Sequence, residues 1–133
     1  MPADHAYDFP VPPEAIDANG HANNVEYVRW MQDAAVRHFE AAGGAPVQAA
    51  AGGTWVVRTH HVEYLKPALA ADVVRVRTWV DGFTRVTSTR HYEFTRPADG
   101  ATLARGKTEW VFVDATTGRP KAIPAEMRGL FGE

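Results

Sequence analysis

Residues 17–30 read DANGHANNVEYVRW, a polar loop that runs directly into a helical pattern. Either Asn23 or Asn24 can cap a helix by accepting a backbone N–H, and apolar residues recur at helical spacing from Val25 onward. A helix start offers unpaired N–H groups and the positive end of the helix dipole. The acid, amide and imidazole beside it therefore predict an anion-stabilising active site in this loop.

One amphipathic helix is predicted from Val25 to Ala42. Its apolar stripe consists of Val28, Met31, Ala35, Phe39 and Ala42. Gly43-Gly44 ends the helix, because glycine readily adopts the left-handed conformation. The Ala/Gly-rich stretch that follows, through Gly53, is predicted to be a mobile connection.

Strands are predicted on both sides of this helix. A short first strand covers residues 5–11 and stops at Pro12-Pro13, because proline cannot donate to a sheet ladder. Beyond the connection the apolar period becomes two, in runs at residues 54–65, 73–80, 86–94 and 101–113. Asp81-Gly82 and residues 97–100 are short turn signals, so the last three runs should form an antiparallel meander.

This order of elements predicts an α+β fold. A lone helix and an antiparallel sheet must bury their apolar sides against each other, because neither can do so alone. A short terminal helix, from Pro124 to Leu130, is expected after the strands. Residues 1–133 are predicted to form one domain, long enough to bury roughly two-thirds of its unfolded surface.

The composition limits the classes of partner. A formal net charge of −2 leaves no excess of Lys and Arg for binding nucleic acid or an anionic membrane surface. No window approaches the roughly 20 apolar residues of a membrane span, and Met1 to Pro10 lacks the basic and apolar regions of a signal peptide. The absence of cysteine removes a thiol nucleophile, disulfides and zinc–thiolate sites. We expect a cytoplasmic protein that acts on a small molecule.

The loop sequence resembles the Asp-x-x-Gly-His-x-Asn-Asn-x-x-Tyr segment of hotdog-fold thioesterases. Across most of its length the chain is similar to the 4-hydroxybenzoyl-CoA thioesterase-like acyl-CoA hydrolases, and in Asp17, Asn19 and His21 it resembles the acyl-ACP thioesterases. A second segment, VEYLKP at residues 62–67, resembles the strand end that follows the central helix in both groups. The resemblance implies a five-stranded antiparallel sheet wrapped around one central helix. It also implies hydrolysis of an acyl-CoA or acyl-ACP thioester without a cofactor.

Asp17 is the first candidate for the chemistry. Its carboxylate is ionised at neutral pH, so it can attack a thioester carbonyl or orient a water, although an Asp here can equally be a turn residue. His21 could relay a proton or position the carbonyl. Asn19 could hold a water, but Asn-Gly is also a common turn dipeptide. Glu63 matches a glutamate of the acyl-ACP enzymes and is otherwise a solvated strand carboxylate.

Further residues of the expected site follow from the resemblance. The family places its oxyanion donor at a backbone N–H near Asn24, next to residues that are also expected as helix caps. The residues expected to bind the substrate or its oxyanion are Asn23, Asn24, Gly20, Tyr27, Thr59 and His60.

Arg85 and Thr87 correspond to the region where the CoA-hydrolysing relatives hold the nucleotide end of CoA. A guanidinium suits a phosphate, although an arginine at a hairpin end is more often only solubilising. No metal site is expected, because His60 and His61 are adjacent on a strand and point to opposite faces.

Two departures from the family leave the substrate open. Glu14-Ala15-Ile16 precedes Asp17 in place of an acid-Thr-Asp lead-in, and Asn24 stands where the bacterial CoA-hydrolysing branch often has histidine or tyrosine. The plastid acyl-ACP enzymes join two hotdog repeats, whereas this chain has room for one. An acyl-CoA-binding module without catalysis and a hotdog dehydratase remain alternatives.

A homodimer or a dimer of dimers is expected. The run 54–65 is a long apolar-rich strand that would be hazardous as a free edge. In the family this strand lies antiparallel to its copy in a second subunit, which brings the acyl pocket to the interface beside both helix starts. A twofold axis near Arg58 and Thr59 would follow.

Overall fold

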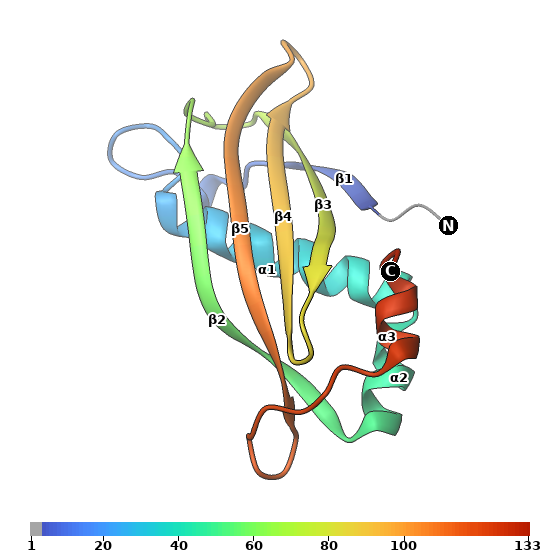
Figure 1. Ribbon diagram of the computed structural model, residues 1–133. Coiled ribbons are helices and arrows are strands. Elements are labelled where there is room, and N and C mark those ends of the chain that lie inside the picture. The colour runs from blue at the N-terminus through green and yellow to red at the C-terminus, as the bar shows by residue number, and fades with distance from the viewer. Residues whose placement is uncertain (1–3) are drawn as a thin grey trace.

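A long helix, α1, crosses the inner face of a five-stranded antiparallel sheet with strand order β1-β3-β4-β5-β2 (Figure 1). The computed structural model describes residues 4–133, and residues 1–3 of the expected single domain lie outside that range. The strands are β1 (Asp4–Pro10), β2 (Gly53–Tyr64), β3 (Val73–Phe83), β4 (Thr87–Arg96) and β5 (Ala101–Asp114). This is the predicted α+β fold, a five-stranded antiparallel sheet around a central helix.

α1 spans Asn24–Ala41 and begins where the polar loop ends. The Asn23 side chain caps it by accepting the Val25 N–H at 3.0 Å, so Asn23 is the cap and Asn24 the first helical residue. The buried face of the helix consists of Tyr27, Trp30, Met31, Ala34, Ala35 and His38. The predicted stripe is therefore confirmed at its centre. Near the helix end, His38 is buried and Phe39 is only partly so.

The sheet is built on the predicted meander of β3, β4 and β5, with β1 and β2 added at its two edges. Within the described residues β2 pairs with β5 alone, so its other edge is free. Gly106 of β5 faces α1, and a Cβ there would come within 2.7 Å of the Met31 Sδ. Glycine at this position lets helix and sheet approach closely.

The connection between α1 and β2 is helical, which corrects the prediction of a mobile connection. α2 spans Gly44–Ala51, and Gly43 and Gly52 flank it with φ angles of +83° and +65°. Alanine has the highest helix propensity, so an Ala-rich segment becomes a helix once glycines set its two ends. Gly44 also lies against the Phe39 ring, where a Cβ would come within 2.5 Å of the ring carbons.

The β3–β4 hairpin turns later than predicted. Asp81-Gly82 lies inside β3 at a bulge between Val80 and Phe83, where Gly82 has a φ of +102°. The turn is instead closed by Thr84, whose hydroxyl oxygen accepts the Thr87 N–H at 2.9 Å. The prediction failed because a bulge and a tight turn both use the positive φ that glycine allows.

Two short helices cover the C-terminal end of α1. α2 contacts both α1 and α3 (Ala125–Leu130), and the three helices lie together at one end of the molecule (Figure 1). A short 3-10 helix, Pro13–Ala15, lies between β1 and the polar loop at the other end. The two ends of α1 therefore have different surroundings.

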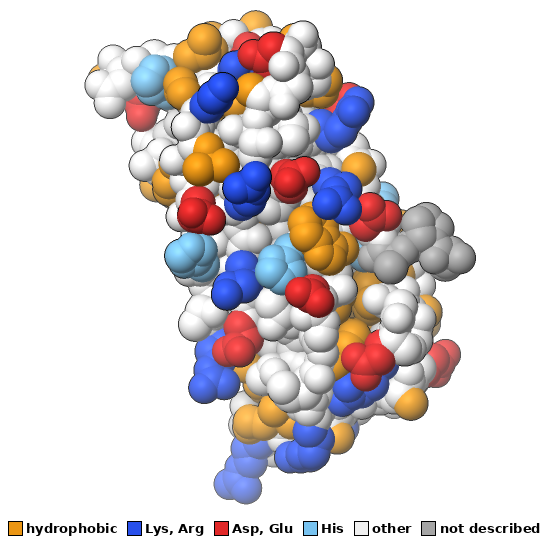
Figure 2. All heavy atoms as spheres, turned by 45° about the horizontal axis from the view of Figure 1, so that its top comes forward, with side chains coloured by type: hydrophobic (Ala, Val, Ile, Leu, Met, Phe, Trp, Pro, Cys, Tyr) orange, Lys and Arg blue, Asp and Glu red, His pale blue; other side chains and the backbone are white. Residues whose placement is uncertain are grey.

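The outer face of the sheet is polar. Figure 2 shows Lys and Arg side chains interspersed with Asp and Glu side chains on this face. Some pair across neighbouring strands, such as Arg75 with Asp8 at 2.7 Å and Arg77 with Asp4 at 3.3 Å. Among residues 4–133, no helix combines the length and the apolar character that crossing a bilayer requires.

Candidate active site at the start of α1

The polar loop closes on itself before it enters α1. The Asp17 N–H donates to the His21 carbonyl at 2.9 Å, and the Gly20 N–H donates to the Asp17 carbonyl at 3.0 Å. Gly20 has a φ of +78°, which a residue with a side chain rarely adopts. The glycine of the motif is therefore explained by the turn that places Asp17 and His21 on one small loop.

The Asp17 carboxylate is held at one oxygen. Its Oδ1 accepts the Asn19 N–H at 2.9 Å, and its other oxygen has no hydrogen-bond partner among residues 4–133. Asn19 thus contributes its backbone to the orientation of Asp17, while its exposed side chain projects from the turn. One carboxylate oxygen is fixed and the other is available to a substrate or a water.

The loop is anchored to its neighbours by main-chain bonds on both sides. The Ala22 N–H donates to the Ala68 carbonyl and the Asn23 N–H donates to the Ala15 carbonyl, each at 2.8 Å. His21 forms a bridge with Leu69. The loop is therefore fixed in place although most of its side chains are exposed.

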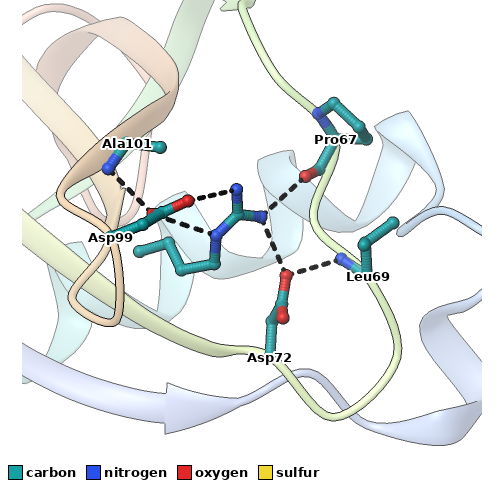
Figure 3. A network of polar contacts seen from close by, with 6 residues as sticks. Pro67, Leu69, Asp72, Asp99 and Ala101 are labelled. Carbon is teal, nitrogen blue, oxygen red and sulfur yellow. Dashed lines mark hydrogen bonds and ion pairs between the residues drawn. The ribbon is translucent and has the colours of Figure 1, made fainter.

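The Arg96 guanidinium holds residues 67–72, the segment to which the polar loop is hydrogen-bonded. Arg96 donates to the Pro67 carbonyl at 3.2 Å and to Asp72 at 3.0 Å, and it also pairs with Asp99 (Figure 3). Asp72 in turn accepts the Leu69 N–H at 2.9 Å. The hydrogen bond from Arg96 is the main reason that the pKa of Asp99 is lowered. Arg96 thus helps to fix the segment to which the loop is hydrogen-bonded.

The start of α1 presents a free donor. The Val25 N–H is bound by the Asn23 side chain and the Glu26 N–H by the Asn23 carbonyl. The Asn24 N–H has no acceptor among the described residues. The resemblance predicts the oxyanion donor at a backbone N–H near Asn24, so this group is the candidate. The N-terminus of a helix also favours negative charge.

A pocket of about 250 Å³ opens beside this donor. Its walls are His21, Ala22, Asn24, Tyr27, Tyr64, Leu65, Lys66 and Pro67. The Tyr64 hydroxyl donates to the Asn24 carbonyl at 2.9 Å, and its ring lies edge-on to that of Tyr27 with centroids 5.3 Å apart. Burial raises the pKa of Tyr27 to about 12, so both phenols are neutral at physiological pH. The end of β2 is therefore tied to the start of α1.

The structure brings most of the predicted residues together. Three of them line the pocket, and four more lie on the loop that adjoins it. The pocket residues are His21, Asn24 and Tyr27, and the loop residues are Asp17, Asn19, Gly20 and Asn23.

The remaining predicted residues lie elsewhere in this chain. Glu63 and Thr59 are exposed on the outer face of β2, opposite Tyr64. His60 faces inward, where its Nδ1 lies 2.9 Å from the Thr108 hydroxyl and burial lowers its pKa. Arg85, in the β3–β4 turn, and Thr87, the first residue of β4, lie at the opposite end of the sheet (Figure 1).

Sequence reasoning missed two contributors to this site. Tyr64 belongs to the second matching segment, so its position there was the available signal, but nothing indicated that its hydroxyl reaches Asn24. Arg96 follows a strand and precedes a turn, and its sequence context resembles that of any surface arginine. Only the fold shows that Arg96 holds the segment behind the loop.

Comparison with known families gives one match that covers nearly the whole chain. The sequence model described as the thioesterase-like superfamily matches residues 11–131, which include the loop, all of α1 and strands β2 to β5. None of the curated proteins compared with the chain matches it.

Solved structures share this fold at low sequence identity. Slr0204, a 1,4-dihydroxy-2-naphthoyl-CoA thioesterase from Synechocystis, is 13% identical with a TM-score of 0.86 over 96% of this chain and 95% of that one. YbaW, a probable thioesterase from Escherichia coli, is 19% identical with a TM-score of 0.86 over 94% of each chain. SAV2348 from Staphylococcus aureus, solved in complex with CoA, is 18% identical with a TM-score of 0.84 over 94% of this chain and 79% of that one. At identities this low, the structural similarity establishes a shared fold and nothing beyond it.

Proposed function

The chain belongs to the thioesterase-like superfamily, and from that membership and its hotdog fold we propose that it hydrolyses an acyl-CoA thioester to a free acid and a free thiol. The observation that carries the proposal is the pairing of two groups at the start of α1. The Asn24 N–H is free among the described residues, and the neighbouring loop presents one unbound oxygen of the Asp17 carboxylate. A donor for an oxyanion and an activating carboxylate are the two groups that thioester hydrolysis needs.

In the proposed reaction the thioester carbonyl oxygen takes the Asn24 N–H. Asp17 either attacks the carbonyl carbon directly, or orients a water that attacks it while the carboxylate accepts a water proton. The negative charge that develops on the oxygen is stabilised by the N–H and by the positive end of α1. The carbon–sulfur bond then breaks, and the thiolate leaves and takes up a proton. Direct attack adds a second step, in which water hydrolyses the mixed anhydride.

His21 is proposed to supply or accept a proton at the mouth of the pocket. It is the histidine of the loop, and its main chain is fixed by one hydrogen bond from the Asp17 N–H and by the bridge to Leu69. An imidazole is well suited to proton transfer near neutral pH. A histidine on a fixed backbone can therefore assist departure of the thiol.

A CoA thioester is the favoured substrate class. Two structural relatives carry CoA in their descriptions, one as a naphthoyl-CoA thioesterase and one as a complex with CoA. We propose that Arg85 and Thr87 contact the nucleotide end of CoA from a second copy of the chain, because within one chain they lie far from the pocket. Acyl-ACP is the alternative substrate class, suggested by the resemblance of Asp17, Asn19 and His21 to the acyl-ACP thioesterases.

The proposed assembly is a homodimer or a dimer of dimers, formed along the free edge of β2. That strand is 12 residues long, and an edge of this length readily pairs with another strand. A twofold axis near Arg58 and Thr59 would place the start of β2 in one copy beside the end of β2 in the other. The β3–β4 turn of one copy would then approach the pocket of the other, whereas Glu63 would lie beside the start of β2 in the other copy.

A free-thiol assay tests the function. Short, medium, long and aromatic acyl-CoAs, together with the matching acyl-ACPs, are each mixed with the protein, and release of thiol is followed. We expect turnover on at least one acyl-CoA. Binding of acyl-CoA with no turnover on any CoA or ACP thioester would mean a non-catalytic binding module. Enoyl product from a 3-hydroxyacyl thioester would mean a dehydratase.

A further inference from the structure

A second cavity, of about 300 Å³, lies at the other end of α1 from the candidate active site. It lies between the C-terminal half of α1 and the inner face of the sheet and opens to the surface, at the end of the molecule where α2 and α3 lie beside the helix (Figure 1). Most of its lining is apolar, including Val36, Phe39, Trp55, Val80, Phe83 and Phe131. An apolar cavity of this size fits a small organic group.

A buried arginine lines this cavity. Arg90 of β4 is only 5% exposed, and its guanidinium carbon lies 5.6 Å from the centre of the Phe131 ring. Its Nη1 donates to His38 Nδ1 at 2.8 Å and to the Thr78 hydroxyl at 3.1 Å. Its Nε and Nη2 atoms have no acceptor among residues 4–133. Several N–H groups of a buried cation are therefore unused.

The neighbours of Arg90 do not balance its charge. His38 is neutral, because burial first and the adjacent Arg90 second lower its pKa to about 4. The Thr78 hydroxyl donates to the His91 carbonyl at 2.9 Å and accepts from Arg90. Within the described chain no carboxylate contacts Arg90. A buried charge without a counterion is costly, which indicates a site made for an anion that the chain itself does not supply.

The Trp110 side chain also lines this cavity. The indole Nε1 of Trp110 is buried and has no hydrogen-bond partner among the described residues. The Ser88 side chain also lines the cavity. The charged side chains that line the cavity are the buried Arg90 and the exposed Glu40. Because Glu40 makes no ion pair with Arg90, the apolar walls and the buried cation match a ligand with an apolar body and an anionic end.

We infer that this cavity binds the distal end of the acyl group and selects acyl groups that end in a carboxylate held by Arg90. The inference rests on the proposed function, because it identifies the acyl class of that substrate. The planar guanidinium has two nitrogens whose N–H groups are free among the described residues, Nε and Nη2, and this fork suits a carboxylate. Acyl groups with the same carbon chain and a methyl end would leave the cation unpaired.

The proposed dimer gives this cavity access to the catalytic pocket. Thr54 and Trp55, at the start of β2, line the cavity, and Tyr64, at the end of β2, lines the catalytic pocket. Antiparallel pairing about Arg58 and Thr59 places the start of one β2 beside the end of the other. The acyl group would then run from the α1 start of one copy into the cavity of the other.

Matched substrates test the selectivity. Each ω-carboxyacyl-CoA from succinyl to sebacoyl is compared with the unsubstituted acyl-CoA of the same length, using kcat/KM for thiol release. We expect the best ω-carboxyacyl-CoA to exceed its partner by at least about tenfold, the scale of a hydrogen bond to a charged group. In Arg90→Met this ratio should fall toward one. Arg105→Met, which removes a cation from the exposed face of β5, should leave the ratio unchanged.

A ratio near one in the wild-type protein, with hydrolysis intact, would overturn the inference and leave the proposed function standing. Because Arg90→Met could fail to fold, the wild-type protein is also titrated with suberate and with octanamide, a neutral chain of the same length, without any thioester. Suberate should bind at least about tenfold more tightly and shift the indole N–H resonance of Trp110. Equal binding, or no shift, would overturn the inference. Tighter suberate binding without hydrolysis of any thioester would support the anion site and refute the proposed function.

Discussion

The two ends of α1 use polar residues in opposite ways. At its start, Asp17 and His21 stand on a loop whose side chains are mostly exposed and whose main chain is tied down by hydrogen bonds. At its far end, His38 and Arg90 are 4% and 5% exposed and bond to each other, and Arg90 lines a mostly apolar cavity. An exposed carboxylate needs no partner to remain charged, whereas a buried cation does. The first arrangement suits catalysis, and the second suits recognition.

The largest effect is expected at the start of the helix. Asp17→Asn should lower kcat by at least ~100-fold, because it removes the charge that attacks or activates water. The fold should be unaffected, since the amide oxygen can still accept the Asn19 N–H. The measurement is kcat for thiol release, with circular dichroism on the same sample. A folded variant with near wild-type turnover would make Asp17 a turn residue.

The next effect concerns stability at the other end of the helix. The pKa of His38 is about 4 in the folded chain against 6.5 in its ordinary state. Its contribution to stability is therefore complete above pH 6.5 and is lost as the pH falls toward 4. At about 1.4 kcal/mol per pKa unit, the free energy of unfolding should drop by about 3 kcal/mol over that interval.

Urea unfolding at a series of pH values measures this loss. Two groups besides Arg90 change the pKa of the His38 imidazole. His5, whose ring stacks on it with centroids 5.6 Å apart, lowers it, and Asp4 raises it. The carboxylates of Asp8, Asp99 and Asp114 have pKa values below their ordinary 3.8, so their contributions are lost only at lower pH. His38→Gln should flatten the curve between pH 6.5 and 4. Parallel curves for the two proteins would show that His38 does not control this step.

A smaller effect is expected from the edge that is proposed to join the two ends of α1. Thr59→Pro removes a strand N–H, and twofold symmetry repeats the loss in both copies. The dimer dissociation constant should rise by about tenfold or more, with activity falling in parallel. Thr59→Val keeps the N–H and serves as the control. Light scattering after size exclusion measures the association, and a fully active wild-type monomer would rule out a shared site.

The smallest effect is expected for His21. Its replacement by alanine removes a proton donor but leaves both the Asn24 N–H and Asp17 in place, so kcat should fall by roughly tenfold or less. If His21→Ala costs more than Asp17→Asn, the imidazole is the principal catalytic group and the two roles assigned here are reversed.

The contrast between the two ends also explains what the sequence could predict. The loop is contiguous, so its helix cap, its glycine turn and its acid appear together in one stretch of the chain. The cluster at the far end joins residues that are 52 and 12 positions apart, Arg90 with His38 and Arg90 with Thr78. Only the pairing of β3 with β4 and the packing of α1 bring them together.

Local errors had local causes. Asp81-Gly82 has the composition of a hairpin turn, yet Gly82 serves a bulge and Thr84 closes the turn. The Ala/Gly-rich connection was expected to be mobile because glycine suggests freedom, whereas its glycines cap both ends of α2. In both places glycine fixed a positive φ, and the sequence alone does not say which structure uses it.

The fate of bound acyl-CoA in a single turnover tests the central claim most directly. Protein in excess is mixed with the best acyl-CoA of the panel, and acid, thiol and remaining thioester are separated and measured at successive times. The account predicts that wild-type protein converts the thioester to acid and thiol in equal amounts, while folded Asp17→Asn binds the substrate and leaves most of it intact. Intact thioester bound to the wild-type protein, or equal conversion by both proteins, would contradict the account.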